Sequence, residues 1–259
     1  MNLSFHHYLK KLILRAFSGE RFQPEQIAQS LIKAQRRPCG KRDAAELKEW
    51  LENRGIQRLV HFTELTNVPY ISRYGLIPRE YLELEVVQMA LGASFADAWR
   101  GDGMLEYNCL SLTSPNYRML WAKRSAQKER RWAVIEFNPK VLTEFFFQFT
   151  PTNAASGCLP NAGIEGAENM FELPQLREDL GLEPPEPTDP QAEALCDSIL
   201  PVRAIENIFV DNEEDADWLA THEVTAVLDS HLFKPRRDYS YWRGKRITQL
   251  PPYLHANTS

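Results

Sequence analysis

Cysteine is scarce in this sequence, and its four copies are too scattered to form a metal or disulfide motif. Cys39, Cys109, Cys158 and Cys196 include no Cys-x-x-Cys pair, and no histidine stands near any of them at the spacing of a zinc site. We therefore expect reduced thiols, a cytoplasmic protein and no bound metal ion.

Long apolar runs are also missing. No stretch approaches the roughly 18 apolar residues that a membrane-spanning helix needs. The N-terminus carries Lys10, Lys11 and a brief apolar run over 12–14, but it has neither a long apolar core nor a small-residue cleavage site. The sequence therefore predicts neither a signal peptide nor a membrane partner.

The glycine-rich motifs of common nucleotide-binding folds do not occur either. The chain contains no G-x-G-x-x-G and no G-x-x-x-x-G-K-[ST]. Both motifs work by bringing backbone amides close to phosphates at the start of a helix. Their absence disfavours a Rossmann or a P-loop site.

Charge of neither sign dominates the chain. Acidic residues outnumber basic ones by 35 to 30, which gives a formal net charge of −5. The charge is uneven, because residues 33–42 and 234–246 are basic whereas residues 164–217 are acidic. Local basic surfaces, not the net charge, would decide whether an anionic polymer binds. With 259 residues, 43% of them hydrophobic, the chain is long enough for one sizeable core.

Apolar periodicity and turn residues predict short strands interleaved with helices. Helices are expected within 1–35, 44–53, 81–100, 117–129 and 213–221. Strands are expected over 58–62, 109–112, 132–137, 145–149, 193–195, 207–210 and 224–228. Residues 182–190 contain four prolines and should be irregular. Because the order has no regular βαβ rhythm, the predicted fold class is α+β.

The most informative stretch is Leu59–Thr63, which is expected to be a strand and carries His61 and Thr63. Alternate residues of a strand point to the same face, so these two side chains should lie side by side. A helix should follow, with Asn67 as its N-cap and Gly75 at its end. Such a strand beside a helix N-terminus can hold a ligand rich in hydroxyls and phosphates.

Four segments, in this order, carry a resemblance to a known family. They are Leu59–Thr63 with Asn67 and Gly75, then Leu110–Met119, Pro151–Ser156 and Pro187–Glu193. On these residues the chain resembles the DarT family of single-stranded DNA ADP-ribosyltransferase toxins, and most of all its DarT1-like branch.

The resemblance implies both a fold and an activity. The fold would be an ADP-ribosyltransferase-like split β-sheet core with surrounding helices over residues 43–259, preceded by an N-terminal helical extension and basic linker over residues 1–42. The activity would be a glycosyl transfer that moves ADP-ribose from NAD+ to a base in single-stranded DNA, releases nicotinamide and needs no metal. The partner implied is a macrodomain antitoxin that removes the modification, since the family's members are toxins of toxin–antitoxin pairs.

The resemblance also implies roles for individual residues. The expected NAD+-binding residues are His61, Thr63, Asn67, Tyr117 and Asn153, of which His61 would hold the adenosine side. The expected catalytic residues are Glu193, at the nicotinamide ribose, and Arg118, near the pyrophosphate. A carboxylate suits the first role, because it can bind a ribose hydroxyl, offset the charge of an oxocarbenium-like transition state and accept a proton. The fallback carboxylates are Asp197, Glu206 and Glu223.

Single-stranded DNA is typically bound by basic side chains along its backbone and by aromatic rings that stack on its bases. The candidate contacts are Lys123, Arg124, Arg236, Arg237, Tyr241, Trp242 and Arg243. The alternative for residues 234–246 is an ordinary solvated tail.

Two other functions stay open on the sequence alone. An NAD+-using ADP-ribosyltransferase could modify RNA or protein instead of DNA. The chain could also be a catalytically silent nucleic-acid-binding module, which would bind oligonucleotides with a steep salt dependence and release no nicotinamide.

Overall fold

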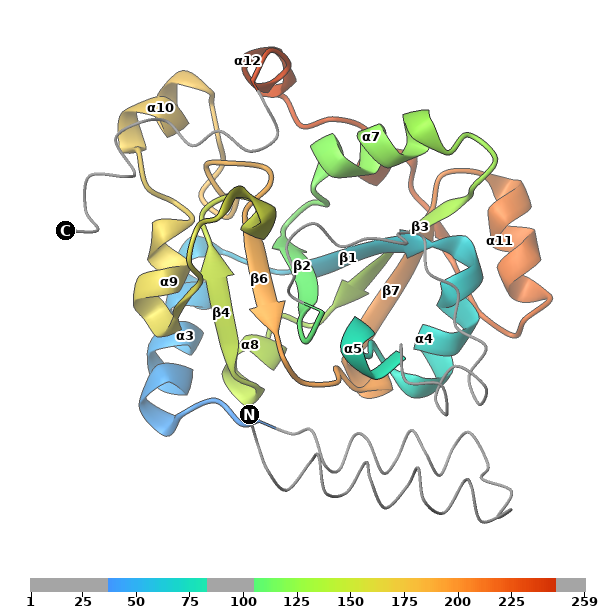
Figure 1. Cartoon of the computed structure of the whole chain (residues 1–259), viewed down its shortest axis with the longest axis horizontal. Helices are drawn as coiled ribbons and strands as arrows, with labels where there is room; N and C mark the ends of the chain where they lie inside the picture. The colour runs from blue at the N-terminus through green and yellow to red at the C-terminus, as the bar shows by residue number, and fades with distance from the viewer. Residues whose placement is uncertain (1–36, 83–104, 246–259) are drawn as a thin grey trace.

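A single mixed sheet with helices around it makes up the computed structural model, which describes residues 37–82 and 105–245 (Figure 1). The strand order is β5-β4-β6-β2-β1-β3-β7-β8. The strands are β1 (Leu59–Glu64), β2 (Asn108–Leu112), β3 (Trp132–Phe137), β4 (Phe147–Thr150), β5 (Asn161–Ala162), β6 (Glu193–Cys196), β7 (Ile205–Val210) and β8 (Val227–Leu228). Neighbouring strands are antiparallel, except that β7 and β8 are parallel.

The sheet is split between β1 and β2. Strand β1 pairs with β3 along its whole length, from Leu59 to Glu64. It pairs with β2 only where Leu59 faces Leu112 and Val60 faces Ser111. Beyond Val60, β1 therefore stays with the β3-β7-β8 half, and Figure 1 shows it running across the direction of β4 and β6. This arrangement confirms the predicted α+β class with a split sheet.

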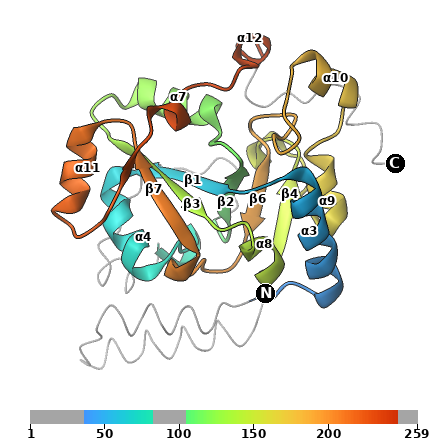
Figure 2. The same ribbon diagram turned by 180° about the vertical axis from the view of Figure 1, so that it is seen from behind.

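Helices flank both halves of the sheet. They are α3 (Lys41–Arg54), α4 (Val68–Tyr74), α5 (Arg79–Leu82), α7 (Tyr117–Ala126), α8 (Val141–Glu144), α9 (Gly163–Asn169), α10 (Pro174–Asp179), α11 (Glu213–Ala220) and α12 (Tyr239–Trp242). Short 3₁₀ turns are η1 (Leu65–Asn67), η2 (Ala154–Ser156), η3 (Val202–Ala204) and η4 (Ser230–Phe233). Seen from behind, α3 and α9 lie beside the β4-β6 half, while α11 and α4 lie at the other end (Figure 2).

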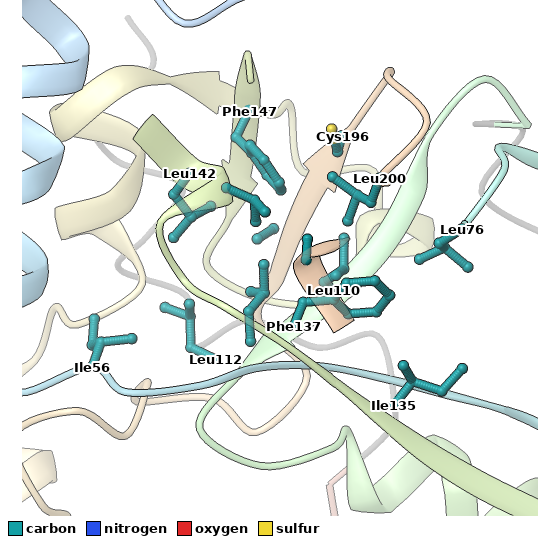
Figure 3. Packing of buried hydrophobic residues seen from close by; sticks show 14 of the residues in the cluster. Ile56, Leu76, Leu110, Leu112, Ile135, Phe137, Leu142, Phe147, Cys196 and Leu200 are labelled. Carbon is teal, nitrogen blue, oxygen red and sulfur yellow. The ribbon is translucent and has the colours of Figure 1, made fainter. Parts of the chain in front are cut away.

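The main hydrophobic core joins the two halves. Figure 3 shows part of it, in which Leu110 of β2, Phe137 of β3 and Cys196 of β6 lie near Leu142 of α8. Each large side chain buried here stabilises the fold by roughly 1.5–3 kcal/mol. A smaller cluster, which includes Leu120, packs α7 against the β1-β3-β7 half. The two clusters therefore pack on the split sheet and hold its strands in position.

Most predicted elements are present, with shifted ends. Strand β3 has the predicted bounds, and α3 ends before Gly55 as expected. Strand β4 begins later than predicted, at Phe147, because the preceding residues form α8 and Phe145 pairs with Pro38. The strand expected over 224–228 is confined to β8.

Helices α9 and α10 and strand β5 were not predicted. Helix α9 packs so closely on β5 that a Cβ on Gly166 would lie 2.1 Å from the carbonyl oxygen of Asn161. Glycine is a poor helix former, so the Gly166 that allows this close approach to β5 also weakens the helical signal of α9 in the sequence. The helices predicted within 1–35 and, beyond Leu82, within 81–100 lie outside the described residues. Within 37–82 and 105–245, no helix is both long and apolar enough to cross a membrane.

Candidate active site

Glu193 is the first residue of β6, an inner strand, and lies at the end of the sheet where that strand begins. It pairs with Thr150 of β4, and only 8% of the residue is exposed. Its Oε2 accepts a hydrogen bond from the backbone N–H of Ala154 at 2.9 Å, and its Oε1 accepts one from Asn153 Nδ2 at 3.3 Å. Both carboxylate oxygens are therefore oriented by the turn that follows β4.

The Asn153 side chain makes two hydrogen bonds in that turn. Its Oδ1 accepts a hydrogen bond from the N–H of Ala155 at 3.0 Å, which caps η2. Its Nδ2 donates to Glu193 Oε1. Asn153 therefore caps η2 with its side-chain oxygen and orients the Glu193 carboxylate of β6 with its side-chain nitrogen. The structure brings together two of the residues expected in the site, Asn153 and Glu193.

Replacement of Asn153 by alanine is expected to lower kcat by about tenfold, because one of the two bonds that orient Glu193 disappears. The KM for NAD+ should change little. Asn138→Ala is a matched control, since Asn138 also accepts from an N–H two residues on and donates to a glutamate, Glu206, at 2.6 Å. Steady-state kinetics of both variants would check this, and equal losses in the two would contradict it.

His61 lies where the two halves of the sheet separate. Its Nδ1 is 2.9 Å from the carbonyl oxygen of Cys109 on β2. The side chain therefore makes a contact across the split at a point where the backbones of β1 and β2 no longer pair. Because β2 is flanked by β1 and β6, His61 and Glu193 stand on the two strands that border it.

Thr63 and Asn67 are also brought together, although not as predicted. Asn67 stands at the N-cap position of α4, as expected, but its backbone is helical and its side chain makes no capping bond. The chain turns through η1 before α4 begins, so Asn67 Nδ2 instead donates to Thr63 Oγ1 at 3.1 Å. The Asn67 amide and the Thr63 hydroxyl therefore lie together at the end of β1, the strand next to β2.

Arg118 and Tyr117 begin α7. Asn116 caps this helix, with its Oδ1 accepting from the N–H of Met119 at 3.1 Å. The Arg118 guanidinium donates to the carbonyl of Lys245. Three buried donors here have no hydrogen-bond partner among the described residues: Arg118 Nη1, the Tyr117 hydroxyl and Asn116 Nδ2. The Tyr117 phenol is a donor at neutral pH, and burial raises its pKa further above the usual value.

The loop before Glu193 is held at several points. Asp189 accepts hydrogen bonds from the Gln191 N–H and the Thr152 hydroxyl, both at 2.8 Å. Burial raises the pKa of its carboxyl, and these two bonds partly offset the rise, as does the positive charge of Arg118.

Thr113 closes this loop from the other side, and sequence reasoning missed it. Its Oγ1 donates to the carbonyl of Pro185 at 2.6 Å, and its backbone has a φ of +67°. A threonine rarely adopts that conformation, and such strain collects at functional sites. The Thr113-Ser114-Pro115 sequence after β2 is the signal that could have indicated a constrained turn. Sequence reasoning also missed the hydrogen bond between Thr152 and Asp189 that holds the loop before Glu193.

The residues expected to contact DNA fall into two groups. Arg236 and Trp242 are 9% and 2% exposed, so the structure does not present them to a DNA strand. Arg237 and Arg124 are more accessible, although each pairs with carboxylates on the protein. The half-buried or exposed candidates are Lys123, Arg124, Arg237, Tyr241 and Arg243.

Metal ligands do not gather in the part of the chain that the structure describes. No three histidine, cysteine, aspartate or glutamate side chains there are placed to hold an ion. The arrangement consists of a buried carboxylate with two fixed oxygens, a histidine at the split and a set of unpartnered buried donors. Such groups can bind hydroxyls and phosphates of a polar ligand.

Comparisons with known proteins find one family. The model described as "ssDNA thymidine ADP-ribosyltransferase, DarT" matches residues 60–237. Among solved structures, DarTG of Thermosipho africanus in complex with ADP-ribose is 18% identical with a TM-score of 0.48, and the match covers 68% of this chain and 51% of that one. This chain thus spans about half the length of that protein.

DarT of Thermus sp. 2.9 also matches in two complexes. The complex with NAD+ is 17% identical, with a TM-score of 0.48 and coverage of 69% of this chain and 98% of that one. The complex with ADP-ribosylated ssDNA is 15% identical, with a TM-score of 0.47 and coverage of 70% and 97%. None of the curated proteins searched matches the chain. Structural similarities this distant do not assign individual residues, so the family model carries the assignment.

Proposed function

Because this chain belongs to the DarT family of ssDNA thymidine ADP-ribosyltransferases, we propose that it transfers ADP-ribose from NAD+ to a base in single-stranded DNA. Membership makes the chain an enzyme of the ADP-ribosyltransferase class, since the family match covers more than half of its length. The observation that supports the proposal most is the buried Glu193, whose two carboxylate oxygens are both fixed from the η2 turn.

The reaction breaks the bond between the nicotinamide nitrogen and the ribose anomeric carbon. The bonding electrons leave with nicotinamide, and positive charge builds up on the ribose, as in glycoside hydrolysis. A carboxylate held in place beforehand offsets this charge without rearranging. A nitrogen of the DNA base then bonds to the anomeric carbon, and Glu193 is the group we assign to accept the proton that this nitrogen loses.

The remaining residues are assigned to the NAD+ donor. His61, Thr63 and Asn67 offer a ring nitrogen, a hydroxyl and an amide near the split of the sheet, which suit the adenosine side. Arg118 and Tyr117 are assigned to the pyrophosphate, and their buried donors without partners among the described residues support this. A phosphate-rich ligand satisfies such donors by charge-assisted hydrogen bonds.

The DNA acceptor is proposed to approach over α7 and the loop before Glu193. Lys123, Tyr241 and Arg243 remain the proposed contacts, with Arg124 and Arg237 available if their carboxylate partners release them. Binding through such side chains should weaken as salt rises.

The choice of acceptor can be tested directly with NAD+ labelled in its ADP-ribose part. The purified protein would be incubated with single-stranded DNA, the same DNA as a duplex, RNA of the same sequence and a mixture of proteins. We expect label on single-stranded DNA alone, and on thymine-containing oligonucleotides in preference to those without thymine, as the family description suggests. Label on RNA or protein instead would favour another acceptor class. Oligonucleotide binding without nicotinamide release would indicate a silent module.

We also propose a cytoplasmic toxin whose modification is removed by a macrodomain antitoxin, an assignment that rests on the family resemblance. Expression of the chain should arrest growth, and co-expression of a macrodomain hydrolase should restore it. Growth arrest that persists with Glu193→Gln would show that toxicity has another cause.

A further inference from the structure

We propose that the C-terminal segment Arg236–Lys245 is a clamp that positions two parts of the active site, the loop before Glu193 and Arg118. The inference rests on the proposed function, because it assigns the segment a part in the same reaction. The family match ends at residue 237, so most of this clamp lies beyond the matched region. Its residues are therefore assigned from the contacts that they make in this chain.

One end of the clamp is the buried Arg236 guanidinium. It donates to the carbonyl of Pro187 at 2.7 Å and to that of Thr188 at 3.1 Å. These carbonyls lie a few residues before Glu193, in the loop that also carries Asp189. A guanidinium can hold two carbonyls and a carboxylate at once, because its donors form a rigid planar fork. Arg236 therefore fixes the backbone of the loop from outside the sheet.

The guanidinium is in turn fixed by Asp238 and Trp242. Arg236 Nε donates to Asp238 Oδ1 at 2.9 Å, and Arg236 Nη2 donates to Asp238 Oδ2 at 2.5 Å. Trp242 Nε1 donates to Asp238 Oδ2 at 2.7 Å, which ties the network to α12. The Asp238 side chain is fully buried and that of Arg236 is 5% exposed. A buried ion pair with its hydrogen-bonding capacity filled is rigid and admits few alternative geometries.

The other end of the clamp reaches the start of α7. The carbonyl of Lys245 accepts a hydrogen bond from the Arg118 guanidinium, whose carbon lies 5.8 Å from the centre of the Trp242 ring. The ring of Tyr239 packs edge-on against that of Tyr117, with centroids 6.2 Å apart. Figures 1 and 2 both show α12 between α7 and α10, over the end of the sheet where β6 begins.

One short segment thus contacts both residue groups assigned to the reaction. The loop before Glu193 and the start of α7 belong to different elements and are far apart in the sequence, so a shift of either would change the position of Arg118 relative to Glu193. A clamp that contacts both would keep this relative position constant. In this account Arg236 and Trp242 are positioning residues that act through Thr188 and Arg118, and they touch neither NAD+ nor DNA.

The test compares Arg236→Lys with a matched control, Arg131→Lys. Lysine keeps the charge opposite Asp238 but lacks the fork, so the bonds to the two loop carbonyls are lost. Arg131 pairs with the buried Asp215 at 3.2 Å and packs 5.1 Å from the centre of the Trp218 ring, and both partners belong to α11. Both variants therefore weaken a comparable arginine–aspartate–tryptophan contact, but only one of them touches the loop.

We expect Arg236→Lys to lower kcat at saturating NAD+ and oligonucleotide by about tenfold or more, since small misplacements of catalytic groups are costly. Its KM for the oligonucleotide should stay within about threefold, whereas loss of a direct DNA contact would raise that KM. Arg131→Lys should keep kcat within about twofold. A folded Arg236→Lys protein with the kcat of the control overturns the proposal.

Amide hydrogen exchange reports on the clamp without requiring activity. Exchange over residues 183–192 should be faster in Arg236→Lys than in Arg131→Lys, and unchanged exchange there overturns the proposal. If the unmodified protein transfers no ADP-ribose, the proposed function fails while this measurement still tests the clamp. Should Arg236→Lys not fold, Trp242→Phe decides, because it keeps an aromatic ring at this position and removes the indole N–H that donates to Asp238. Faster exchange in that variant supports the clamp, and exchange like that of the unmodified protein overturns it.

Discussion

Replacement of Glu193 by glutamine is expected to lower the rate of ADP-ribose transfer by about 10³-fold or more, because one side chain supplies both charge stabilisation and the proton acceptor. Glutamine has nearly the same shape and can still accept the hydrogen bond from the Ala154 N–H. The thermal unfolding curve should therefore stay close to that of the unmodified protein. Nicotinamide release and oligonucleotide labelling, measured on the same samples, would check the prediction.

Glu206→Gln is the control for this experiment. Glu206 also accepts a hydrogen bond from an asparagine, Asn138, but it lies on the exposed start of β7. It was one of the fallback carboxylates on the sequence alone. Transfer should be unaffected by its loss. An active Glu193→Gln protein together with an inactive Glu206→Gln protein would show that the catalytic assignment is wrong.

Replacement of Gly75 by alanine is expected to reduce the free energy of unfolding by at least about 3 kcal/mol, because two independent costs coincide. Gly75 has a φ of +85° and a ψ of 176°, a combination that is essentially restricted to glycine. A Cβ there would also lie 2.2 Å from the carbonyl oxygen of Leu200. That carbonyl accepts the hydrogen bond from Leu76 that joins the end of α4 to the segment after β6. The clash is with backbone, which cannot rotate away.

Gly157→Ala separates the two costs. Gly157 also has a positive φ, +81°, but a Cβ there would meet nothing within 4 Å. We expect a loss of only about 1–2 kcal/mol, the cost of the left-handed conformation by itself. Urea unfolding of both variants gives the comparison. Equal losses of unfolding free energy in the two variants would mean that the clash between a Cβ at residue 75 and the Leu200 carbonyl adds nothing to the destabilisation.

The sequence predicted those parts of the fold whose signals are local. Strand β3 is an apolar run interrupted only by Glu136, and α3 combines apolar periodicity with a glycine just past its end, so each was placed well. Helix α9 and strand β5 have no comparable pattern, because the packing of Gly166 on Asn161 depends on contact between two segments. Asn67 stands at the predicted N-cap position of α4, but it is also the last residue of η1, and its side chain donates to Thr63 instead of capping the helix.

The candidate site divides in the same way. The resemblance to the DarT family indicated Glu193 and Asn153, and the structure adds the bond between them. The basic and aromatic residues after 233 indicated a DNA-binding surface, but residue type does not reveal the partner. Asp238 lies two residues after Arg236 and draws its guanidinium inward, so that Arg236 is buried while Arg237 remains exposed. Contacts of this kind depend on where the loop before β6 lies, and no local pattern encodes that.

The most direct test of the central claim is the intact mass of a single-stranded, thymine-containing oligonucleotide after incubation with NAD+ and the protein. The account predicts that the oligonucleotide gains the mass of one ADP-ribose with the unmodified protein, and gains nothing with Glu193→Gln or without NAD+. Release of nicotinamide by the unmodified protein while the oligonucleotide keeps its mass would contradict the claim that DNA is the acceptor. An equal gain of mass with Glu193→Gln would contradict the role assigned to Glu193.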